Sequence, residues 1–418
     1  MNKHQIHNLG VDTLTKKFNL DAEYFLKGGL FNSIQLGIGL LCGLIVNYIF
    51  GHFLSKTVYG EYSLILSITS IFTFLSLPGI DIALIQSVGQ GYSGTLIPAF
   101  ITKIKISLVG GLILFAVSLH YFLKHEYIIS QGILIISLLF PFLYSFGIYS
   151  ALLTAQRKFA ILALFASFSS LFYLLINTVI ILWRPSTVYV VVSYLIGIII
   201  PSLAGFLYCK KYSINSEVDK NISKYGSFLT LVNALPWISG NLGSVILGNI
   251  LGVVPLATFS VANSFLGDVQ KVFIVFYKPI TAKLAQQTVK EHSKTILVHL
   301  PKFIAIGIFL CLGLWFVVPY LVHFLFPQYQ EAIFYAKLLS LALIPLPITW
   351  VVNDMLVYQK KKAPQLFSSI VPQISKIILY FILIPTYKIN GLILIILLDR
   401  YTAPMISLYF LIRERRHK

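Results

Sequence analysis

The sequence predicts an all-α polytopic membrane protein with twelve transmembrane helices, arranged as two pseudo-repeated six-helix bundles around a central cavity. Three observations predict it: an apolar composition, recurrent apolar runs of spanning length, and a charge bias between alternate loops. The 418 residues are 57% apolar and 11% charged, with a mean hydropathy of +0.84. Soluble domains are about 45–50% apolar and about 25% charged. The composition therefore argues against a soluble enzyme, and it is the opposite of that of a disordered chain.

Apolar runs of spanning length are the second observation. A helix that crosses a hydrocarbon core of about 30 Å needs about 20 apolar residues, whereas barrel strands alternate in polarity over about ten. In the seventh run, Pro236 predicts a break of the helix. The twelve predicted spans are 30–50, 62–84, 106–123, 131–153, 161–183, 187–209, 226–250, 256–277, 303–323, 333–357, 366–386 and 391–412.

These spans divide the chain into five parts. Residues 1–29 are a cytoplasmic N-terminal segment, in which the spacing of apolar residues fits either a short interfacial helix or an ordinary polar leader. Residues 30–209 form the N-terminal six-helix bundle, and a cytoplasmic linker follows at 210–225. Residues 226–412 form the C-terminal six-helix bundle, and 413–418 are a basic cytoplasmic tail.

Charge gives the orientation. With twelve spans, both termini lie on one side, and 24 of the 32 lysines and arginines fall on that side, including Lys103 in the predicted loop 85–105. Only four lie on the opposite side, and four lie inside spans. Cytoplasmic loops are the ones enriched in Lys and Arg. The bias predicts cytoplasmic termini and accounts for most of the net charge of +18.

The two halves of the chain also resemble each other. FGHFLSKTVYGEYSLI (50–65) aligns with LGNILGVVPLATFSVA (247–262) at an offset of 197 residues. PFLYSFGIYSALLTAQRKFA (141–160) echoes PLPITWVVNDMLVYQKKKAP (345–364), and both begin with proline and end on glutamine followed by basic residues. The offset of this second pair is about 203 residues, close to the first. The two similar offsets indicate six spans repeated in the same orientation. Parallel repeats with a site at their interface are typical of transporters.

Four stretches resemble a known family, the polysaccharide biosynthesis proteins. These are lipid-linked oligosaccharide (O-antigen type) flippases of the multidrug/oligosaccharidyl-lipid/polysaccharide exporter superfamily. Gln86 stands where this family usually has a basic residue, and Pro327 where it often has glycine. The stretches are LSKTVYGEYSLILSITSIF with LPGIDIALIQSVGQG (54–91), LTAQRKF (153–159), VFYKPITAKLAQQ (275–287) and LFPQYQEAIFYAKLLSLALIPL (325–346).

Signals of catalysis, cofactors or metals are missing from the sequence. The carboxylates on the predicted outer segments, Glu61, Asp81, Glu126 and Glu331, are scattered and form no acid–base pair. No GxxxxGK[ST] nucleotide-binding loop occurs, and the three widely spaced cysteines fit neither a disulfide framework nor a metal site. We therefore expect no enzyme activity and no cofactor.

Ionisable and amide residues inside the spans are the candidate site residues, because burying them in lipid is costly unless they face a cavity or a partner. Asp268 and Lys271 lie one helical turn apart and can pair. Asp268 and Asp354 are the candidates for ion coupling, and Arg400 can instead pair locally with Asp399. For each residue, the alternative is a polar clamp between helices or a side chain that reaches the interface. The candidate substrate-binding residues are Lys271, Lys376, Asp268, Lys278, Gln35, Asn47, Asn241, Asn263 and Arg400.

The resemblance implies a flippase of the bacterial inner membrane. Its substrate would be a polyprenyl-pyrophosphate-linked oligosaccharide, moved by alternating access to the outer leaflet for surface polysaccharide assembly. Its partners would be this glycan, membrane lipids and other polysaccharide-assembly proteins, but no nucleic acid. A pyrophosphate needs compensating cations in a low-dielectric cavity, which Lys271 and Lys376 would supply. The alternatives are an organic-cation efflux antiporter, which Asp354 favours, and a membrane polymerase, which lacks the expected long outer loop.

Overall fold

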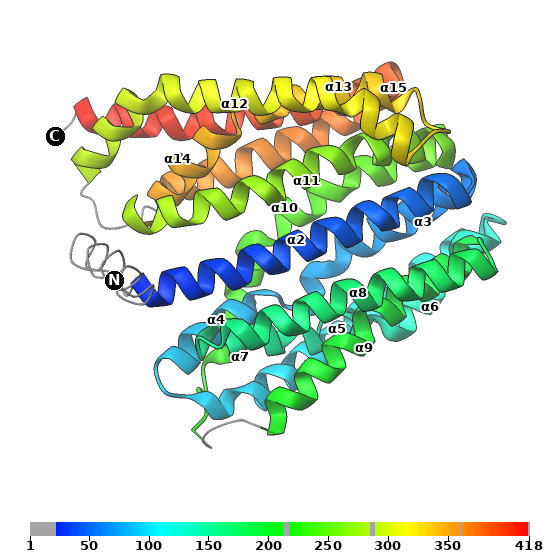
Figure 1. The fold of residues 1–418 in the computed structure, drawn as a ribbon, viewed down its shortest axis with the longest axis horizontal. Coiled ribbons are helices and arrows are strands. Elements are labelled where there is room, and N and C mark those ends of the chain that lie inside the picture. The colour runs from blue at the N-terminus through cyan, green and yellow to red at the C-terminus, as the bar shows by residue number, and fades with distance from the viewer. Residues whose placement is uncertain (1–21, 212–216, 285–288, 359–361, 417–418) are drawn as a thin grey trace, which may run out of the picture.

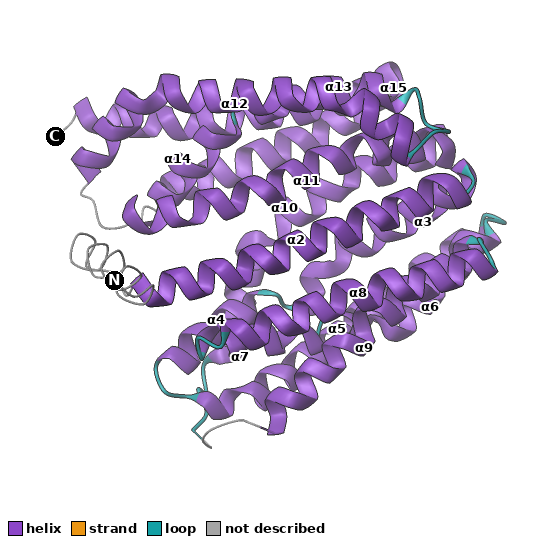
Figure 2. Ribbon diagram, viewed as in Figure 1, coloured by secondary structure: helices purple, strands orange, loops and turns teal. Residues whose placement is uncertain are grey.

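The computed structural model describes residues 22–211, 217–284, 289–358 and 362–416, and every regular element in these ranges is a helix (Figure 2). The interfacial helix considered for the N-terminal segment falls mostly outside the described residues. The first half contains α2 (Ala22–Phe53), α3 (Lys56–Ile71), α4 (Gly79–Gly89), α5 (Leu96–Leu123), α6 (Tyr127–Leu143), α7 (Tyr149–Ala155), α8 (Phe159–Trp183) and α9 (Thr187–Lys211). The second half contains α10 (Ile222–Leu251), α11 (Val253–Leu284), α12 (Val289–Leu325), α13 (Ala332–Ser340), α14 (Leu346–Tyr358) and α15 (Lys362–Arg416).

The described residues contain 10 helical segments that are long and apolar enough to cross a membrane. One of these segments, 370–406, covers the last two predicted spans. A kink at Lys388, which has the non-helical angles φ 56° and ψ −132°, separates the two. The eighth predicted span corresponds to α11, which lies outside the ten and carries Asp268 and Lys271 in its middle. Each of the twelve predicted spans therefore coincides with a helical segment. The all-helical membrane fold is confirmed.

Three of the spans are interrupted by short 3-10 segments. They separate α3 from α4, α6 from α7, and α13 from α14. Pro141 lies in the last turn of α6, before the second interruption, and Pro345 lies at the third. Proline removes a backbone donor and clashes with the preceding turn. These two interruptions occupy equivalent places in the repeated halves. The break predicted at Pro236 is wrong, because α10 continues through this residue; neighbouring groups in a bundle can satisfy the carbonyl that proline frees.

Two lobes result from this arrangement. Figure 1 shows α10 to α15 on one side and α4 to α9 on the other, with α2 and α3 between them. Because α2 packs along α8, α2 and α3 are counted with the first lobe. Helix α2 begins and α15 ends at the same end of the bundle, here named the terminus end (Figure 1). The opposite end, here named the short-loop end, carries the connections at Leu54–Ser55, Gly252 and 326–331. This common end for both terminal helices agrees with an even number of crossings.

The lobes meet along a seam in which α3 and α4 pack against α10 and α11. Glycines make the approach close. A Cβ atom at Gly60 would overlap the carbonyl oxygen of Val253, and one at Gly79 would overlap that of Gly226. Gly79 is also tied to α10 by a hydrogen bond from its backbone N–H to Thr230 Oγ1 at 3.0 Å. Small residues allow such backbone contact between transmembrane helices.

A second set of contacts, here named the seal, joins the two lobes at the short-loop end. A Cβ atom at Gly51 of α2 would overlap the carbonyl oxygen of Leu325. The ring of Tyr59 lies 6.0 Å from that of Tyr329 and 6.3 Å from that of Phe326, so aromatic side chains of both lobes meet here. Phe326 is fully buried. The lobes are therefore in contact at the short-loop end.

Opening this seal by substitution is expected to change access to the interior. In Gly51→Val, the added side chain forces α2 away from Leu325, and overpacking of this kind costs about 1–3 kcal/mol. Accessibility of a cysteine at Ser264, introduced after removal of the native cysteines, should rise about tenfold or more from the short-loop side. The measurement is labelling with a membrane-impermeant maleimide. Gly37→Val is the matched control, because nothing lies within 4 Å of its Cβ position; equal labelling of both variants would remove Gly51 from the seal.

Candidate functional site

A cavity of about 600 Å³ lies between the lobes, on the side of the seal that faces the terminus end. Its first-lobe wall comes from α2, α3 and α8, and its second-lobe wall comes from α11. The wall changes character along its length. Polar and charged side chains of α2 and α11 line one part, and aromatic side chains of α2, α3 and α8 line the part beside the seal. Concave sites with a few convergent polar groups are the usual form of a ligand-binding pocket.

Five of the nine candidate substrate-binding residues line this cavity. Gln35 and Asn47 lie on α2, and Asn263, Asp268 and Lys271 lie on α11. The two helices come from opposite halves of the chain, so the cavity is formed at the interface of the repeats. This is where parallel-repeat transporters bind substrate.

Lys271 is the one cation among the described residues that line the cavity. Its Nζ donates a hydrogen bond to Asp268 Oδ1 at 2.8 Å. The Lys271 side chain is 64% exposed and that of Asp268 is 31% exposed, so the pair faces open space. An ion pair with this much exposure is worth little, about 0–1 kcal/mol. Lys271 can therefore exchange its partner for a ligand anion at small cost, and its ammonium has further donors to offer.

The remaining candidates lie elsewhere. Asn241 donates to the carbonyl oxygen of Trp237 at 3.0 Å within α10. Lys376 Nζ donates to Asp399 Oδ2 at 3.1 Å, with side-chain exposures of 11% and 15%. Arg400 follows Asp399 inside the second lobe and is half-buried. The side chains of Lys278 and Asp354 lie outside the described residues.

The Lys376–Asp399 pair lies in the second lobe, where further polar contacts join α10 and α15. Ser239 of α10 donates a hydrogen bond to the side chain of Gln373 on α15. Tyr380 Oη donates to the carbonyl oxygen of Ser239 at 3.0 Å. These bonds fasten α10 to α15, and the Lys376–Asp399 pair joins the two spans that lie on either side of Lys388 in α15, as expected of a polar clamp between helices. Neither member of the pair is among the residues that line the cavity.

Tyrosines at the sealed part of the cavity were missed by the sequence analysis. Tyr62 Oη lies 3.5 Å from Tyr173 Oη, which joins α3 to α8. Phe50 of α2 meets Tyr59 and Tyr62 edge-on, with ring centroids 5.9 and 5.7 Å apart. Tyr59, Tyr62, Tyr173 and Phe50 all line the cavity. Aromatic residues inside spans carry no charge signal, and only their 3-residue spacing in the VYGEYS motif pointed to a shared face.

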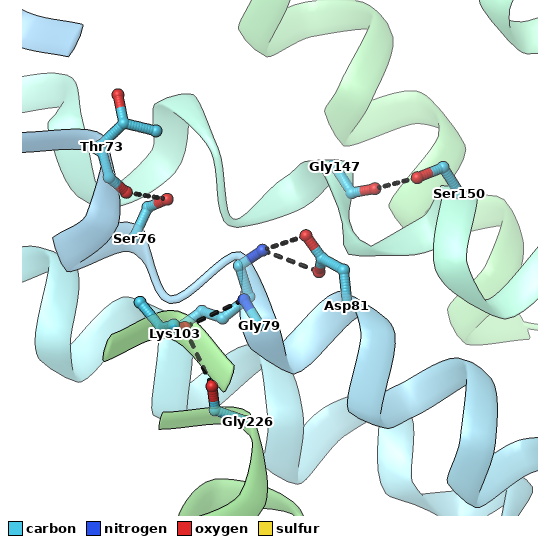
Figure 3. Close-up of polar contacts among 9 residues, drawn as sticks. Thr73, Ser76, Gly79, Asp81, Lys103, Gly147, Ser150 and Gly226 are labelled. Atoms are coloured by element: carbon cyan, nitrogen blue, oxygen red, sulfur yellow. Dashed lines mark hydrogen bonds and ion pairs between the residues drawn. The ribbon is translucent and has the colours of Figure 1, made fainter. Parts of the chain in front are cut away.

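A buried ion pair in the first lobe was also missed. Lys103 Nζ donates to both carboxylate oxygens of Asp81 at 2.8 Å, joining α5 to α4 (Figure 3). Lys103 is 1% exposed, whereas the sequence analysis placed it in a loop. Asp81 was placed on an outer segment, but it lies in the first turn of α4. Figure 3 shows the pair beside Gly79, where α4 meets α10.

A metal site needs several converging ligand side chains. No group of three or more His, Cys, Asp or Glu side chains that could hold a metal ion occurs in the described part of the chain. Cys42, Cys209 and Cys311 are buried free thiols. The groups that the cavity offers are donors, acceptors and aromatic faces, which suit binding.

Several solved structures share this fold. A multidrug resistance MATE family transporter of the MOP superfamily in an inward-facing conformation has a TM-score of 0.70 and 12% identity, with coverage of 91% of this chain and 97% of that chain. The outward-facing conformation of such a transporter has a TM-score of 0.65 and 14% identity, covering 93% and 95%. The MATE transporter ClbM in complex with Rb⁺ has a TM-score of 0.57 and 12% identity, covering 93% and 94%. At these identities the likeness concerns the fold.

The fold and the interlobe cavity define the class: the described residues form a multi-pass helical membrane protein with the fold of these MATE structures. The sequence profile described as "Polysaccharide biosynthesis protein" matches residues 25–284, more than half of the chain. The chain belongs to this family of polysaccharide biosynthesis proteins, and the resemblance found in the sequence is confirmed. No curated protein sequence matches it significantly.

Proposed function

We propose that this protein is a flippase that moves a polyprenyl-pyrophosphate-linked oligosaccharide from the cytoplasmic to the outer leaflet of the bacterial inner membrane. The observation that carries the proposal is the exposed Lys271 in a cavity between the two repeats of a polysaccharide biosynthesis protein. A pyrophosphate that leaves water needs a positively charged donor, and hydrogen bonds between charged groups are the strong ones. Asp268 holds Lys271 in place until the pyrophosphate replaces Asp268 as the partner of the lysine.

The lipid tail would stay in the bilayer beside α2. Apolar side chains of this helix point outward next to its cavity-lining positions, with Ile34 51%, Leu41 63% and Ile45 47% exposed. Gln35 and Asn47 of the same helix face the cavity. Helix α2 therefore offers a polar face to the glycan and an apolar face to the polyprenyl chain. The polyprenyl chain is apolar, so it stays in lipid because its exposure to water is unfavourable.

Movement would follow rocking of one lobe against the other. The seal at the short-loop end blocks the cavity there, and its contacts between Gly51 and Leu325 would break when the cavity opens to that side. The charge bias of the loops supports a cytoplasmic position for the terminus end. In this proposal the protein acts on the position of the glycan without covalent chemistry, and other polysaccharide-assembly proteins supply and use it.

A second candidate is supported by one side chain. Asp268 is the one carboxylate among the described cavity-lining residues, and an organic cation would pair with it in place of Lys271. Transport of such cations would make the protein an efflux antiporter. We rank this second, because Lys271 lies in the same helical turn and repels a cation.

Deletion of the gene distinguishes these functions. Loss of a flippase should leave the lipid-linked oligosaccharide intact but confined to the cytoplasmic leaflet, and surface polysaccharide should be lost. The measurement is leaflet-specific labelling of the lipid-linked sugar. Precursor that reaches the outer leaflet without polymerisation would instead indicate a polymerase. Unchanged polysaccharide with lost resistance to cationic drugs would indicate the antiporter.

A further inference from the structure

The aromatic part of the cavity differs chemically from the part around Lys271. Among the described residues that line it, the charged groups Asp268 and Lys271 lie on the later turns of the cavity-lining stretch of α11. Tyr59 and Tyr62 lie near the start of α3, beside the seal. Asn263 precedes Lys271 by eight residues, which along a helix is about 12 Å. One elongated ligand can therefore touch both parts at once.

The aromatic part is suited to a neutral ligand rich in hydroxyl groups. Tyrosine presents an apolar face and a polar tip, and asparagine both donates and accepts hydrogen bonds. A sugar ring has the matching features, an apolar C–H face and edges of hydroxyl groups. The Tyr62–Tyr173 contact of 3.5 Å is long for an O–H···O bond, so a ligand hydroxyl can improve on it. Asn263 is exposed and lies on the facing wall.

We infer that Tyr62, Tyr173 and Asn263 form a saccharide-binding subsite, separate from the pyrophosphate position at Lys271. This inference rests on the proposed function and adds the way in which the substrate lies: its pyrophosphate is at Lys271, and its first sugars point toward the seal. Tyr59 connects the subsite to the seal, because its ring packs against Tyr329 of the second lobe at 6.0 Å. A sugar in the subsite lies directly beneath the contacts that must open.

An aromatic cage for an organic cation is the competing interpretation of these rings. Cations bind over aromatic faces, and Asp268 would add a counter-charge. The two interpretations differ in what the hydroxyl groups do. A cation uses the faces of the rings and leaves the hydroxyls idle, whereas a sugar needs the hydroxyls. Phenylalanine substitution, which keeps the ring and removes the hydroxyl, separates the two.

Binding to the purified full-length protein tests the inference with three probes. These are geranylgeranyl pyrophosphate, the same lipid carrying N-acetylglucosamine on the pyrophosphate, and tetraphenylphosphonium. We expect the parent protein to bind the sugar-bearing lipid about tenfold more tightly than the sugar-free lipid, since a few hydrogen bonds are gained. Tyr62→Phe with Tyr173→Phe should bring this ratio close to one while affinity for the sugar-free lipid stays within about twofold. Lys271→Ala should weaken binding of both lipids.

The matched control is Tyr189→Phe, whose hydroxyl bonds Arg184 outside the cavity, and it should keep the ratio of the parent protein. Equal affinities of the parent protein for both lipids would overturn the saccharide subsite and leave the proposed function standing. A sugar preference that survives the double substitution would also overturn it. Binding of tetraphenylphosphonium with neither lipid bound would overturn the proposed function itself.

Discussion

Lys271→Ala is expected to reduce surface polysaccharide about 10- to 100-fold while the protein still accumulates in the membrane. The range follows from hydrogen bonds to charged groups, which contribute about 1.5–3 kcal/mol each. Folding should tolerate the change, because the side chain is 64% exposed and its one described partner is Asp268 in the same helix. The measurements are surface polysaccharide by immunoblot and protein level in isolated membranes. Lys271→Arg should retain more function than Lys271→Ala, since it keeps the charge.

A double variant separates binding from simple charge balance. If Lys271 served only to neutralise Asp268, then Asp268→Asn with Lys271→Ala would restore function. If Lys271 binds the pyrophosphate, the double variant stays defective, because no other described cavity-lining side chain is cationic. Lys124→Ala, which removes an exposed lysine at the short-loop end, is the control for lost charge alone. Normal polysaccharide in the double variant would refute the role of Lys271.

The path of the chain through the membrane was predictable because its signals are local. Hydropathy reports spans one at a time, and each loop contributes its own charges. The boundaries of a helix differ from those of the predicted span where the helix extends beyond its apolar run. Helix α5 begins at Leu96, ten residues before the predicted span, and this early start buries Lys103. A lysine near a span boundary looks like a loop residue unless its partner is known, and Asp81 is 22 residues away.

The site was predictable where polarity marks it. Gln35, Asn47 and Asn263 stand out because lipid disfavours amides, and the cavity is what makes their positions acceptable. Lys376 stands out by the same rule, yet its partner Asp399 lies on the following span and only folding brings them together. Polarity inside a span therefore indicates that a partner or a cavity exists, without indicating which. The tyrosines gave no such signal, since tyrosine is common in apolar helices.

Asp81→Asn is expected to destabilise the first lobe, in contrast to Lys271→Ala. The substitution leaves the ammonium of Lys103 without a counter-charge at a position that is 1% exposed. Breaking one side of a fully buried ion pair costs about 3–5 kcal/mol; because the Asp81 side chain is 33% exposed, the cost here is smaller, about 1–3 kcal/mol. A loss of about 1–2 kcal/mol already changes cellular abundance several-fold. The protein level in membranes should therefore fall at least several-fold, and polysaccharide with it. The measurements are membrane abundance and thermal unfolding in detergent.

The apolar double variant Asp81→Leu with Lys103→Met is the decisive comparison. Replacement of both members of a buried pair by apolar residues of similar size is often close to neutral. Abundance should therefore recover relative to Asp81→Asn, although two of the charges in the lobe are gone. Export should recover with it if the pair serves stability, since Gly79 and Thr230 hold the adjacent seam without help from either charge. Recovered abundance without recovered export would instead give the pair a part in transport, and an Asp81→Asn protein of normal abundance and unfolding temperature would refute the structural role.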